Sequence, residues 1–420
     1  MNMAVVSLLA LAAAIVAGFI LKINVGIVSI ALAYLIGLIY GIPAGKIISG
    51  FSSSMALTMI GVLYLFGIIS NNGTLEVLAK KITKVAEKQK FLLYVAMFAI
   101  GAILSGVGPG AIPTLAIVPV LAIPVALKAG INPILLSLVG QMGAQAVRMS
   151  PITPEAVVVS GLMTEQGLDG NTVPAMWCLF VTELAMIAAS FIVFKGWKFE
   201  EPMKGIQEEE NPSFSGKQRI SLIGLALMII SVVVFNCNVG LVSFLIGSIL
   251  VVLKCGDDKA ALKSLPWNTI LLVLGMGVLM NIVKLAGGVE LLANSIASVC
   301  TDRTASPLMC LAAGIMSFFA SGLGVVFPTL IPTVGGIAQG LNGVSPNELM
   351  AAVVIGGTVA GFTPISTAGA LVLAGVSQFE GIHDKYPQNK MFIELFIVSF
   401  IALFISVAFA GLGVYRIICG

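Results

Sequence analysis

The chain has 420 residues, of which 58% are hydrophobic and 10% are charged, and its mean hydropathy is +1.08. A soluble globular domain is far more polar, so this composition excludes that class. Many windows exceed about 18 apolar residues, the length at which a helix crosses the roughly 30 Å hydrocarbon core of a bilayer. The sequence therefore predicts an all-α, polytopic membrane protein, and its net charge of +3 gives no sign of a nucleic-acid partner.

The apolar segments can be taken in chain order. The first, about 3–22, runs directly into another and carries no small-residue cleavage site, so we interpret it as a membrane anchor rather than a cleaved signal peptide. Further spans follow at about 24–42, 54–71, 175–195, 219–237, 239–254, 269–286 and 391–416. Four other segments, at 91–126, 132–163, 306–338 and 346–376, do not fit a single regular span.

Two of these four segments, 91–126 and 306–338, break at their centres at Ser-Gly-x-Gly and nearby prolines. Each half is too short to span alone, so both segments are predicted to be re-entrant helical hairpins. The other two, 132–163 and 346–376, are longer than a span needs and carry Ser-Pro or Thr-Pro at mid-length. This pattern predicts a discontinuous helix, because proline interrupts the helical hydrogen bonds.

The same features recur at a nearly constant spacing. Asn-Val-Gly-Ile-Val-Ser at 24–29 matches Asn-Val-Gly-Leu-Val-Ser at 238–243, and Gly61 matches Gly275. Three further matches pair 73–79 with 287–293, the hairpin motif at 105 with that at 321, and Ser150-Pro-Ile-Thr153 with Thr363-Pro-Ile-Ser366. Five collinear matches indicate a duplicated unit.

Each half then holds about five transmembrane spans, one re-entrant hairpin and one discontinuous helix. Because five is an odd number, the two halves are predicted to be inverted repeats. The first repeat covers 1–197 and the second 219–420, joined by a cytoplasmic linker at 198–218 that contains the acidic run Glu208–Glu210.

The basic residues are distributed unevenly over this layout. Seventeen of the 22 Lys and Arg fall on one side of the membrane, four (Lys46, Lys284, Arg303 and Arg416) fall on the other, and Arg148 lies within a span. The positive-inside rule makes the first side cytoplasmic. We therefore expect a multi-pass protein of the plasma or inner membrane with both termini outside.

Inverted repeats with broken helices at matching positions are typical of secondary transporters, whose binding site lies near the middle of the membrane. Lipid cannot satisfy the free N–H and C=O groups of a broken helix, so they must line an enclosed, wet cavity. Helix N-termini there attract an anion, while hydroxyl and carbonyl oxygens suit a small cation such as Na⁺.

The repeated order of hairpin, broken helix and span resembles the ion transporter superfamily that contains the divalent-anion/sodium symporters. The stretch Asn24–Ala79, with Phe66-Gly-Ile-Ile-Ser-Asn-Asn-Gly-Thr-Leu-Glu76, is similar to the amino-terminal region of malonate/dicarboxylate carriers. This resemblance implies a scaffold part (about 1–90 and 219–305) and a mobile transport part (about 91–197 and 306–420). It also implies a homodimer and elevator-like alternating access.

The resemblance also implies site residues. The symporters carry Ser-Asn-Thr at both hairpin tips, where this chain has Ser105-Gly106-Val107 and Ser321-Gly322-Leu323, so only the serines are kept. The broken helices add further substrate-binding candidates, which are Ser150, Pro151, Thr153, Thr363, Pro364, Ser366 and Thr367. A coupling Na⁺ would lie at Ser105, Gly106, Ser321 and Gly322, and no other cofactor is expected.

Arg148 is the most specific single candidate. A charge near the bilayer centre costs roughly 2.5–3.5 kcal/mol, so it normally faces a cavity or a partner. The matching position in the second half is Gly361, so the fold does not require a cation there. A guanidinium beside a helix break can bind a carboxylate through two hydrogen bonds. The alternative is a salt bridge to Glu155 or Glu183.

Three glutamates are candidates for proton coupling. Glu155 follows Thr153-Pro154, a helix-start signature, so it could equally be an ordinary first-turn carboxylate. Glu183 and Glu394 occupy matching positions in the two halves, which favours a structural role as the alternative.

Other chemistry finds little support in the sequence. The single histidine, His383, lies in a charged loop, and the six cysteines lack metal or redox spacing. No phosphate-binding loop appears, so we expect that ATP does not drive the protein directly. We also expect no enzyme activity. The sequence favours a secondary active transporter of a small carboxylate, above all a dicarboxylate, coupled to Na⁺ or H⁺. A cation/proton antiporter of the same superfamily and an anion channel are the alternatives.

Overall fold

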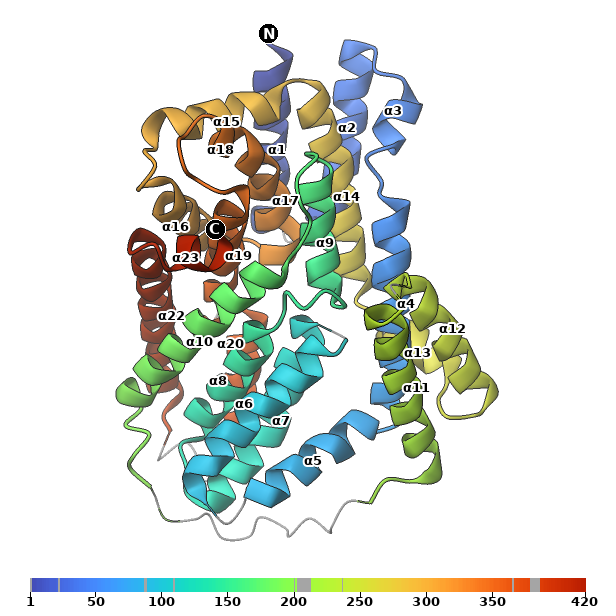
Figure 1. Cartoon of the computed structure of the whole chain (residues 1–420), viewed down its shortest axis with the longest axis vertical. Coiled ribbons are helices and arrows are strands. Elements are labelled where there is room, and N and C mark those ends of the chain that lie inside the picture. The colour runs from blue at the N-terminus through green and yellow to red at the C-terminus, as the bar shows by residue number, and fades with distance from the viewer. Residues whose placement is uncertain are drawn as a thin grey trace.

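The computed structural model describes residues 2–21, 23–86, 89–108, 110–199, 201, 213–235, 237–364, 366–377 and 386–420. Every secondary-structure element in these ranges is helical (Figure 1). The predicted all-α class is therefore confirmed. The acidic run of the linker and His383 lie outside the described residues.

The first half contains ten helices in the described part of the chain. They are α1 (Met3–Leu21), α2 (Val25–Tyr40), α3 (Ala44–Ile48), α4 (Ser53–Asn71), α5 (Thr74–Ala86), α6 (Lys90–Gly106), α7 (Ala111–Ala129), α8 (Pro133–Ala146), α9 (Pro154–Thr164) and α10 (Val173–Val193). The predicted hairpin is the α6–α7 pair, and the predicted broken helix is the α8–α9 pair.

The second half repeats this order. It contains α11 (Gly216–Val233), α12 (Val239–Val252), α13 (Asp258–Ser264), α14 (Trp267–Leu285), α15 (Gly288–Val299), α16 (Ala305–Ser317), the π-helix η1 (Gly322–Val326), α17 (Phe327–Leu330), the 3₁₀-helix η2 (Ile331–Thr333), α18 (Val334–Gln339), α19 (Pro346–Val359), the 3₁₀-helix η3 (Ala360–Phe362), α20 (Thr367–Ser377), α22 (Gln388–Gly411) and α23 (Val414–Cys419).

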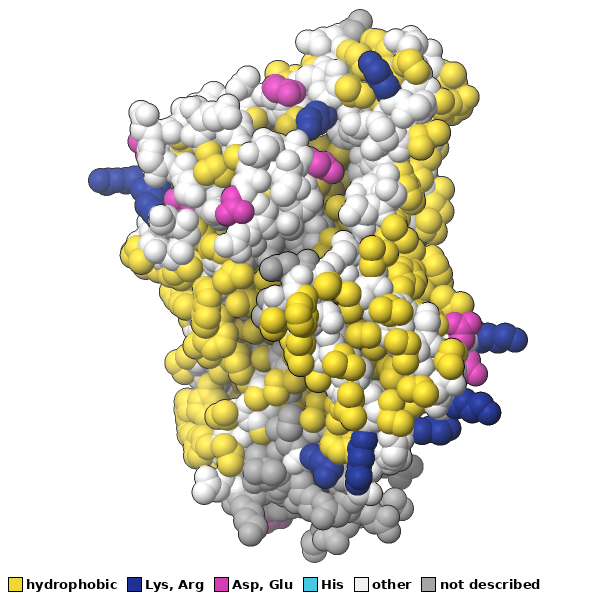
Figure 2. Space-filling model, turned by 45° about the vertical axis from the view of Figure 1, so that its right-hand side comes forward, with side chains coloured by type: hydrophobic (Ala, Val, Ile, Leu, Met, Phe, Trp, Pro, Cys, Tyr) yellow, Lys and Arg dark blue, Asp and Glu magenta, His cyan; other side chains and the backbone are white. Residues whose placement is uncertain are grey.

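Six helices in the described residues are long and apolar enough to cross a membrane. They are Ala44–Asn71, Ala111–Ala129, Val173–Val193, Trp267–Leu285, Gly322–Gln339 and Asn389–Gly411. Shorter apolar helices, among them Val25–Tyr40 and Val239–Val252, accompany them. In Figure 2 apolar side chains form a broad band across the middle and along the right side of the face, while charged side chains lie above this band and at the lower right. This surface is typical of a protein that lies in a bilayer.

Four helices were not predicted as elements. The short helices α3 and α13 each precede a span, and the amphipathic helices α5 and α15 each follow one. They are too short or too charged to be recognised as spans. In Figure 1, α15 lies near the top of the molecule and α5 near the bottom, so equivalent helices occupy opposite ends.

The two halves contact each other through equivalent glycines. A Cβ on Gly61 would overlap the carbonyl oxygen of Gly240, and a Cβ on Gly275 would overlap that of Gly26. Gly26 matches Gly240 and Gly61 matches Gly275 in the sequence repeat, so exchanging the halves converts one contact into the other. Such reciprocal contacts are those of a two-fold relation. The glycines let α4 approach α12, and α2 approach α14, closely.

The second hairpin is less regular than the first. Its returning arm passes through η1, α17, η2 and α18, whereas α7 is one continuous helix despite Pro119 and Pro124. Pro328 and Pro332 lie in this arm, and each removes a backbone donor. Pro328 lies in the first turn of α17 and Pro332 in the 3₁₀-helix η2.

Candidate functional site

A hydroxyl group forms hydrogen bonds across the break in the first discontinuous helix. The hydroxyl of Thr153 donates to two backbone carbonyls. Its Oγ1 lies 2.6 Å from the oxygen of Arg148 and 2.8 Å from that of Ser150. The same oxygen accepts from the N–H of Ala156 at 3.3 Å, so Thr153 caps the start of α9. The break exists because Pro151 and Pro154 cannot supply helical N–H groups.

The second break is built in the same way. Ser366 Oγ lies 2.6 Å from the carbonyl oxygen of Gly361 and 2.7 Å from that of Thr363. It accepts from the N–H of Gly369 at 3.2 Å. Each of these atoms is 213 residues beyond its counterpart in the first break. The sequence predicted Thr153 and Ser366 as substrate-binding residues. In the structure their hydroxyls form hydrogen bonds with the backbone at the two breaks.

The chain passes through the two breaks in opposite directions. In Figure 1, α8 and α20 lie in the lower half of the molecule, whereas α9 and α19 lie above them. α20 packs against α8, and η3 packs against α19. Opposite directions are expected of inverted halves, although the inverted relation of the complete halves stays a prediction.

Arg148 lies where the two broken helices meet. Its side chain is 6% exposed, and Nη1 donates to Gln145 Oε1 at 3.0 Å and to Thr358 Oγ1 at 3.1 Å. The guanidinium carbon lies 5.6 Å from the ring centre of Phe327 on the second hairpin. Nε has no hydrogen-bond partner. One edge of the guanidinium is thus held by the protein, and the other is unused.

The surroundings of Arg148 are nearly symmetric. Gln145 and Thr358 occupy matching positions, and so do Arg148 and Gly361. The contact from Arg148 to Thr358 has its counterpart between Gly361 and Gln145, because a Cβ on Gly361 would lie 3.1 Å from Gln145 Nε2. Arg148 is therefore a charge added on one side of a nearly two-fold junction.

The acidic candidates lie in different environments. Glu155 is 2% exposed, and its Oε1 accepts from the N–H of Ala111, the first residue of α7, at 2.8 Å. Glu183 on α10 is 1% exposed, and its Oε2 has no hydrogen-bond partner. Glu394 is partly exposed and lies 3.8 Å from Lys390. The matched pair Glu183 and Glu394 is thus not matched in structure.

The alternative salt bridge of Arg148 is not formed. No ion pair within 4.0 Å joins Arg148 to Glu155 or Glu183, all of which are described residues. Both carboxylates are near enough to interact with the guanidinium through space. They contribute to the electrostatic field at the guanidinium.

The first hairpin tip packs on the first helix break. Ser105 lies in the last turn of α6, fully buried, and its Oγ has no hydrogen-bond partner. A Cβ on Gly106 would lie 2.8 Å from the side chain of Val147, which directly precedes Arg148. Val107 ends α6 and is partly buried. The first hairpin tip therefore lies beside the residue that precedes the arginine.

The second tip differs in detail. Ser321 caps η1, and its Oγ accepts from the N–H of Gly324 at 3.2 Å. A Cβ on Gly322 would overlap the carbonyl oxygen of Gly357 on α19, next to Thr358, and Leu323 is buried. Ser321 is thus a cap, whereas its counterpart in α6 has a free hydroxyl.

The remaining candidates lie at the breaks themselves. Ser150 is partly buried, Pro151 is exposed, and Thr363 and Pro364 are buried. Thr367 begins α20, and its side chain lies outside the described residues. No atom is present that would show which of them contacts a ligand, so their roles in binding stay predictions.

Three polar residues at this junction were missed by the sequence analysis. They are Gln145 and Thr358, which hold Arg148, and Gln141, whose Nε2 donates to the carbonyls of Leu115 and Ala368 at 3.1 and 3.2 Å. Gln141 and Gln145 lie one turn apart on the same face of α8, and Arg148 follows Gln145 by three residues, just past the end of that helix. That spacing, and the match of Gln145 with Thr358, were the available signals.

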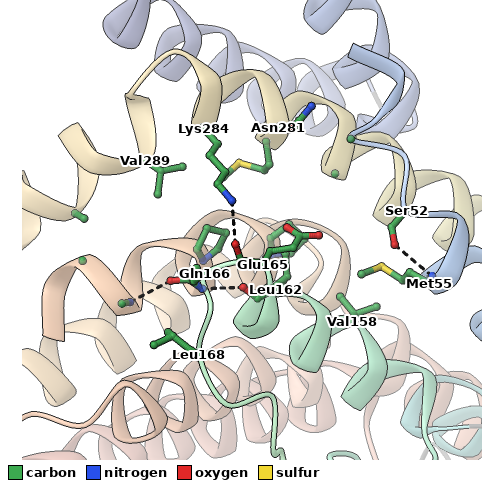
Figure 3. Close-up of a pocket in the computed structure, with 18 of the residues that line it drawn as sticks. Ser52, Met55, Val158, Leu162, Glu165, Gln166, Leu168, Asn281, Lys284 and Val289 are labelled. Atoms are coloured by element: carbon green, nitrogen blue, oxygen red, sulfur yellow. Dashed lines mark hydrogen bonds between the residues drawn. The ribbon is translucent and has the colours of Figure 1, made fainter. Parts of the chain in front are cut away.

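A cleft of about 590 Å³ lies between the predicted scaffold and transport parts. Its walls come from α4, α14 and α15 on one side and from α9, α17, η2 and α18 on the other. Figure 3 shows Lys284 of α14 pointing across it, where Nζ donates to the backbone carbonyl of Glu165 at 3.0 Å. Desolvation in the cleft raises the pKa of the Glu165 carboxyl, and the charge of Lys284 partly offsets the rise.

The glycines of both tips also touch the predicted scaffold. A Cβ on Gly108 would overlap the ring of Phe66 in α4, and a Cβ on Gly324 would overlap the side chain of Leu272 in α14. The hairpin tips thus lie between the helix breaks on one side and α4 and α14 on the other.

Comparison with known proteins adds two family matches. Residues 1–148 match the family described as dicarboxylate carrier protein MatC N-terminus, and residues 237–419 match the family described as citrate transporter. Comparison with curated proteins gives no match. The matched families consist of carriers, not enzymes.

The chain is a membrane transporter. Its fold is similar to that of the YdaH transporter of Alcanivorax borkumensis, with a TM-score of 0.60 and 13% identity over 90% of this chain and 89% of that one. MtrF of Neisseria gonorrhoeae, described with a class of antimetabolite efflux pumps, gives a TM-score of 0.58 and 13% identity over 90% and 84%. The resemblance that the sequence indicated is confirmed, and the structural likeness concerns the fold alone.

Proposed function

We propose that this transporter is a secondary active carrier of a small carboxylate, favouring dicarboxylates. A Na⁺ or H⁺ gradient drives it, and the predicted transport part moves in an elevator-like way. The observation that carries the proposal is the free edge of the Arg148 guanidinium at the junction of the two broken helices.

The geometry of this arginine suits a carboxylate. Nη1 is committed to Gln145 and Thr358, which fixes the plane of the guanidinium. The edge formed by Nε and Nη2 presents two parallel N–H donors, which match the two oxygens of a carboxylate. A buried cation with unused donors is costly in the empty carrier, so a ligand that supplies the missing acceptors gains the full benefit.

The second carboxylate of the substrate would be bound by residues of the second half of the chain. The residues around Ser321 and Thr363 lie opposite the first break and carry no charge of their own. Hydroxyl and backbone N–H groups there would bind a carboxylate more weakly than an arginine. Unequal subsites suit a short dicarboxylate held mainly at one end.

Alternating access draws support from the contacts of the hairpins. Both tips meet the predicted scaffold through glycines, which leave smooth surfaces against α4 and α14. The polar contact across the cleft is a single lysine–carbonyl hydrogen bond among the described lining residues. Few directional bonds then need to break when one part slides past the other.

Uptake by the purified carrier in proteoliposomes tests the function. We expect saturable uptake of a radiolabelled dicarboxylate that requires an imposed Na⁺ or H⁺ gradient and competes poorly with monocarboxylates. Uptake without saturation would indicate a channel. Cation exchange for protons without carboxylate movement would indicate an antiporter.

A further inference from the structure

Gln166 inserts its side-chain amide into the backbone hydrogen bonds of the second hairpin. Its Oε1 accepts from the N–H of Gly335 at 3.1 Å, and its Nε2 donates to the carbonyl oxygen of Ile331 at 3.0 Å. These two backbone groups lie four residues apart and would pair with each other in a continuous α-helix. Figure 3 shows the Gln166 side chain hydrogen-bonded to this neighbouring helix. Side chains inserted in this way are a known cause of bends in helices.

The interrupted arm is a wall that the cleft and the candidate substrate site share. The ring of Phe327 in α17 lies 5.6 Å from the guanidinium carbon of Arg148, whereas the next residue, Pro328, lines the cleft. Farther along the arm, Gly335 also lines the cleft, while Val334 beside it is fully buried. A change in the shape of the arm would therefore change the separation between the cleft and Arg148.

The insertion lets the arm adopt a second form at little cost in hydrogen bonds. If the amide of Gln166 withdraws, the N–H of Gly335 can bond directly to the carbonyl of Ile331, as in a regular helix. Gln166 lines the cleft and is partly exposed, so water can satisfy its amide after withdrawal. The equivalent arm of the first hairpin, α7, is one continuous helix and is not divided in this way.

We propose that residues 327–339 form a gate between the cleft and the Arg148 site, and that Gln166 holds this gate closed. This inference rests on the proposed function. The cleft opens on the side that carries Lys284, which is the predicted outer side. A carboxylate entering from there reaches Arg148 when the amide withdraws and the arm becomes a more regular helix. Gln166 is a positioning residue, because it acts on the arm and does not itself contact the substrate.

Opening of the gate can be measured by labelling a cysteine within the arm. Val334→Cys replaces a fully buried side chain, so a trimethylammonium methanethiosulfonate reagent should reach it only when the arm opens. Peptide mass spectrometry of the purified full chain distinguishes this cysteine from the native ones. Adding Gln166→Leu removes both hydrogen bonds to the arm and should raise the labelling rate by about tenfold or more. The matched control is Gln339→Leu, which removes an exposed amide from the same cleft and should change the rate by less than about twofold.

A second labelled position separates gate opening from general loosening of the fold. Leu136 lies in α8 of the first half and is also fully buried. Gln166→Leu should leave the labelling rate of Leu136→Cys within about twofold of its value in the wild-type background. An equal rise at both labelled positions would show that Gln166 only stabilises the fold. That result, or an unchanged rate at Val334→Cys, would overturn the proposal.

Closing the gate covalently tests whether the substrate passes through it. The variant Gln166→Cys with Gly335→Cys is bridged by a short bis-methanethiosulfonate reagent, which replaces the link made by the amide. Uptake of succinate in proteoliposomes should fall by about tenfold or more, and dithiothreitol should restore it. The control is the wild type treated in the same way, in which Cys178 and Cys419, with Sγ atoms 3.5 Å apart, can be bridged outside the gate. The control should keep its uptake.

The outcomes separate this inference from the proposed function. If the wild type transports succinate and the bridged variant keeps full uptake, the gate is wrong and the proposed function stands. If the wild type transports no carboxylate, the proposed function fails. The gate then loses its substrate, even where labelling of Val334→Cys shows that the arm opens.

Discussion

Arg148 makes the junction of the two broken helices asymmetric, because the matching position in the second half is Gly361. Its neighbours Gln145 and Thr358 are equivalent by position, yet both accept hydrogen bonds from the same nitrogen. The opposite side has Gly361, which carries no charge and lies against Gln145. A cation on one side only gives the junction a polarity, so an elongated anion would bind there in one orientation.

Replacing Arg148 tests its role in binding. Arg148→Lys keeps the charge but loses the planar pair of donors, so we expect dicarboxylate binding to weaken by about tenfold or more. Arg148→Ala should abolish it. Ligand-induced thermal stabilisation of the purified variants is the measurement. Arg416→Lys is a suitable control, because Arg416 pairs with Glu348 at 3.1 Å away from the junction. Wild-type stabilisation of Arg148→Ala would show that the residue only supports the fold.

The capping hydroxyls should matter for stability in equal measure. Thr153→Val and Ser366→Ala each remove a helix cap and take the hydroxyl donor away from the carbonyl of Arg148 or Gly361, so each should cost about 1–2 kcal/mol. The expected drop in melting temperature is similar for both, because their hydrogen bonds are equivalent. Ser49→Ala, which removes an exposed hydroxyl, is the control. A drop for only one of them would show that the breaks are not equivalent.

The hairpins and broken helices are the elements that could be read most directly from the sequence. The segment 132–163 contains α8 and α9, and 346–376 contains α19, η3 and α20, because proline and capping residues mark such breaks locally. The amphipathic α5 and α15 could not be recognised by an apolar-span criterion. For the partners of Arg148 the sequence offered only the spacing of Gln145 and its match with Thr358, and these could not show contact, since which side chains meet across two breaks depends on packing between the halves.

Gly322 limits how closely the second hairpin can approach α19. A Cβ there would meet the backbone carbonyl of Gly357, which cannot move aside like a side chain. Gly322→Ala should therefore reduce uptake by about tenfold or more while the protein still reaches the membrane. Gly45→Ala is the control, because its Cβ would meet no atom within 4 Å. Equal uptake by the two variants would show that the tip does not depend on this contact.

Cysteine chemistry can check the packing of α10 against α23. Cys178 and Cys419 are far apart in the sequence, but their Sγ atoms lie 3.5 Å apart. A disulfide needs about 2.05 Å, so a small movement suffices. Copper–phenanthroline should cross-link this pair, seen by mass spectrometry as a loss of two hydrogens and as one linked peptide. Cys178→Ser should prevent it. Separate alkylation of both thiols after oxidation would contradict the contact.

The orientation of the whole molecule follows from its basic residues. The predicted cytoplasmic side carries Lys259, exposed on α13, and the predicted outer side carries Asp169, exposed between α9 and α10. In a Cys237→Ser background, Asp169→Cys should react with an impermeant maleimide in intact cells. Lys259→Cys should react only after permeabilisation. The reverse pattern would place both termini in the cytoplasm and invert the predicted layout.

The reciprocal glycine contacts also bear on how the chain is made. Gly26 and Gly61 enter the membrane early in synthesis, yet their partners on α14 and α12 are made roughly two hundred residues later. Until then α2 and α4 must rest against lipid, which can cover apolar surface but forms no close backbone contact. Insertion of the helices and their final packing are thus separated in time. The centre of the molecule is completed only when the second half has been threaded into the bilayer, so a ribosome stalled before α14 leaves an inserted but unassembled carrier.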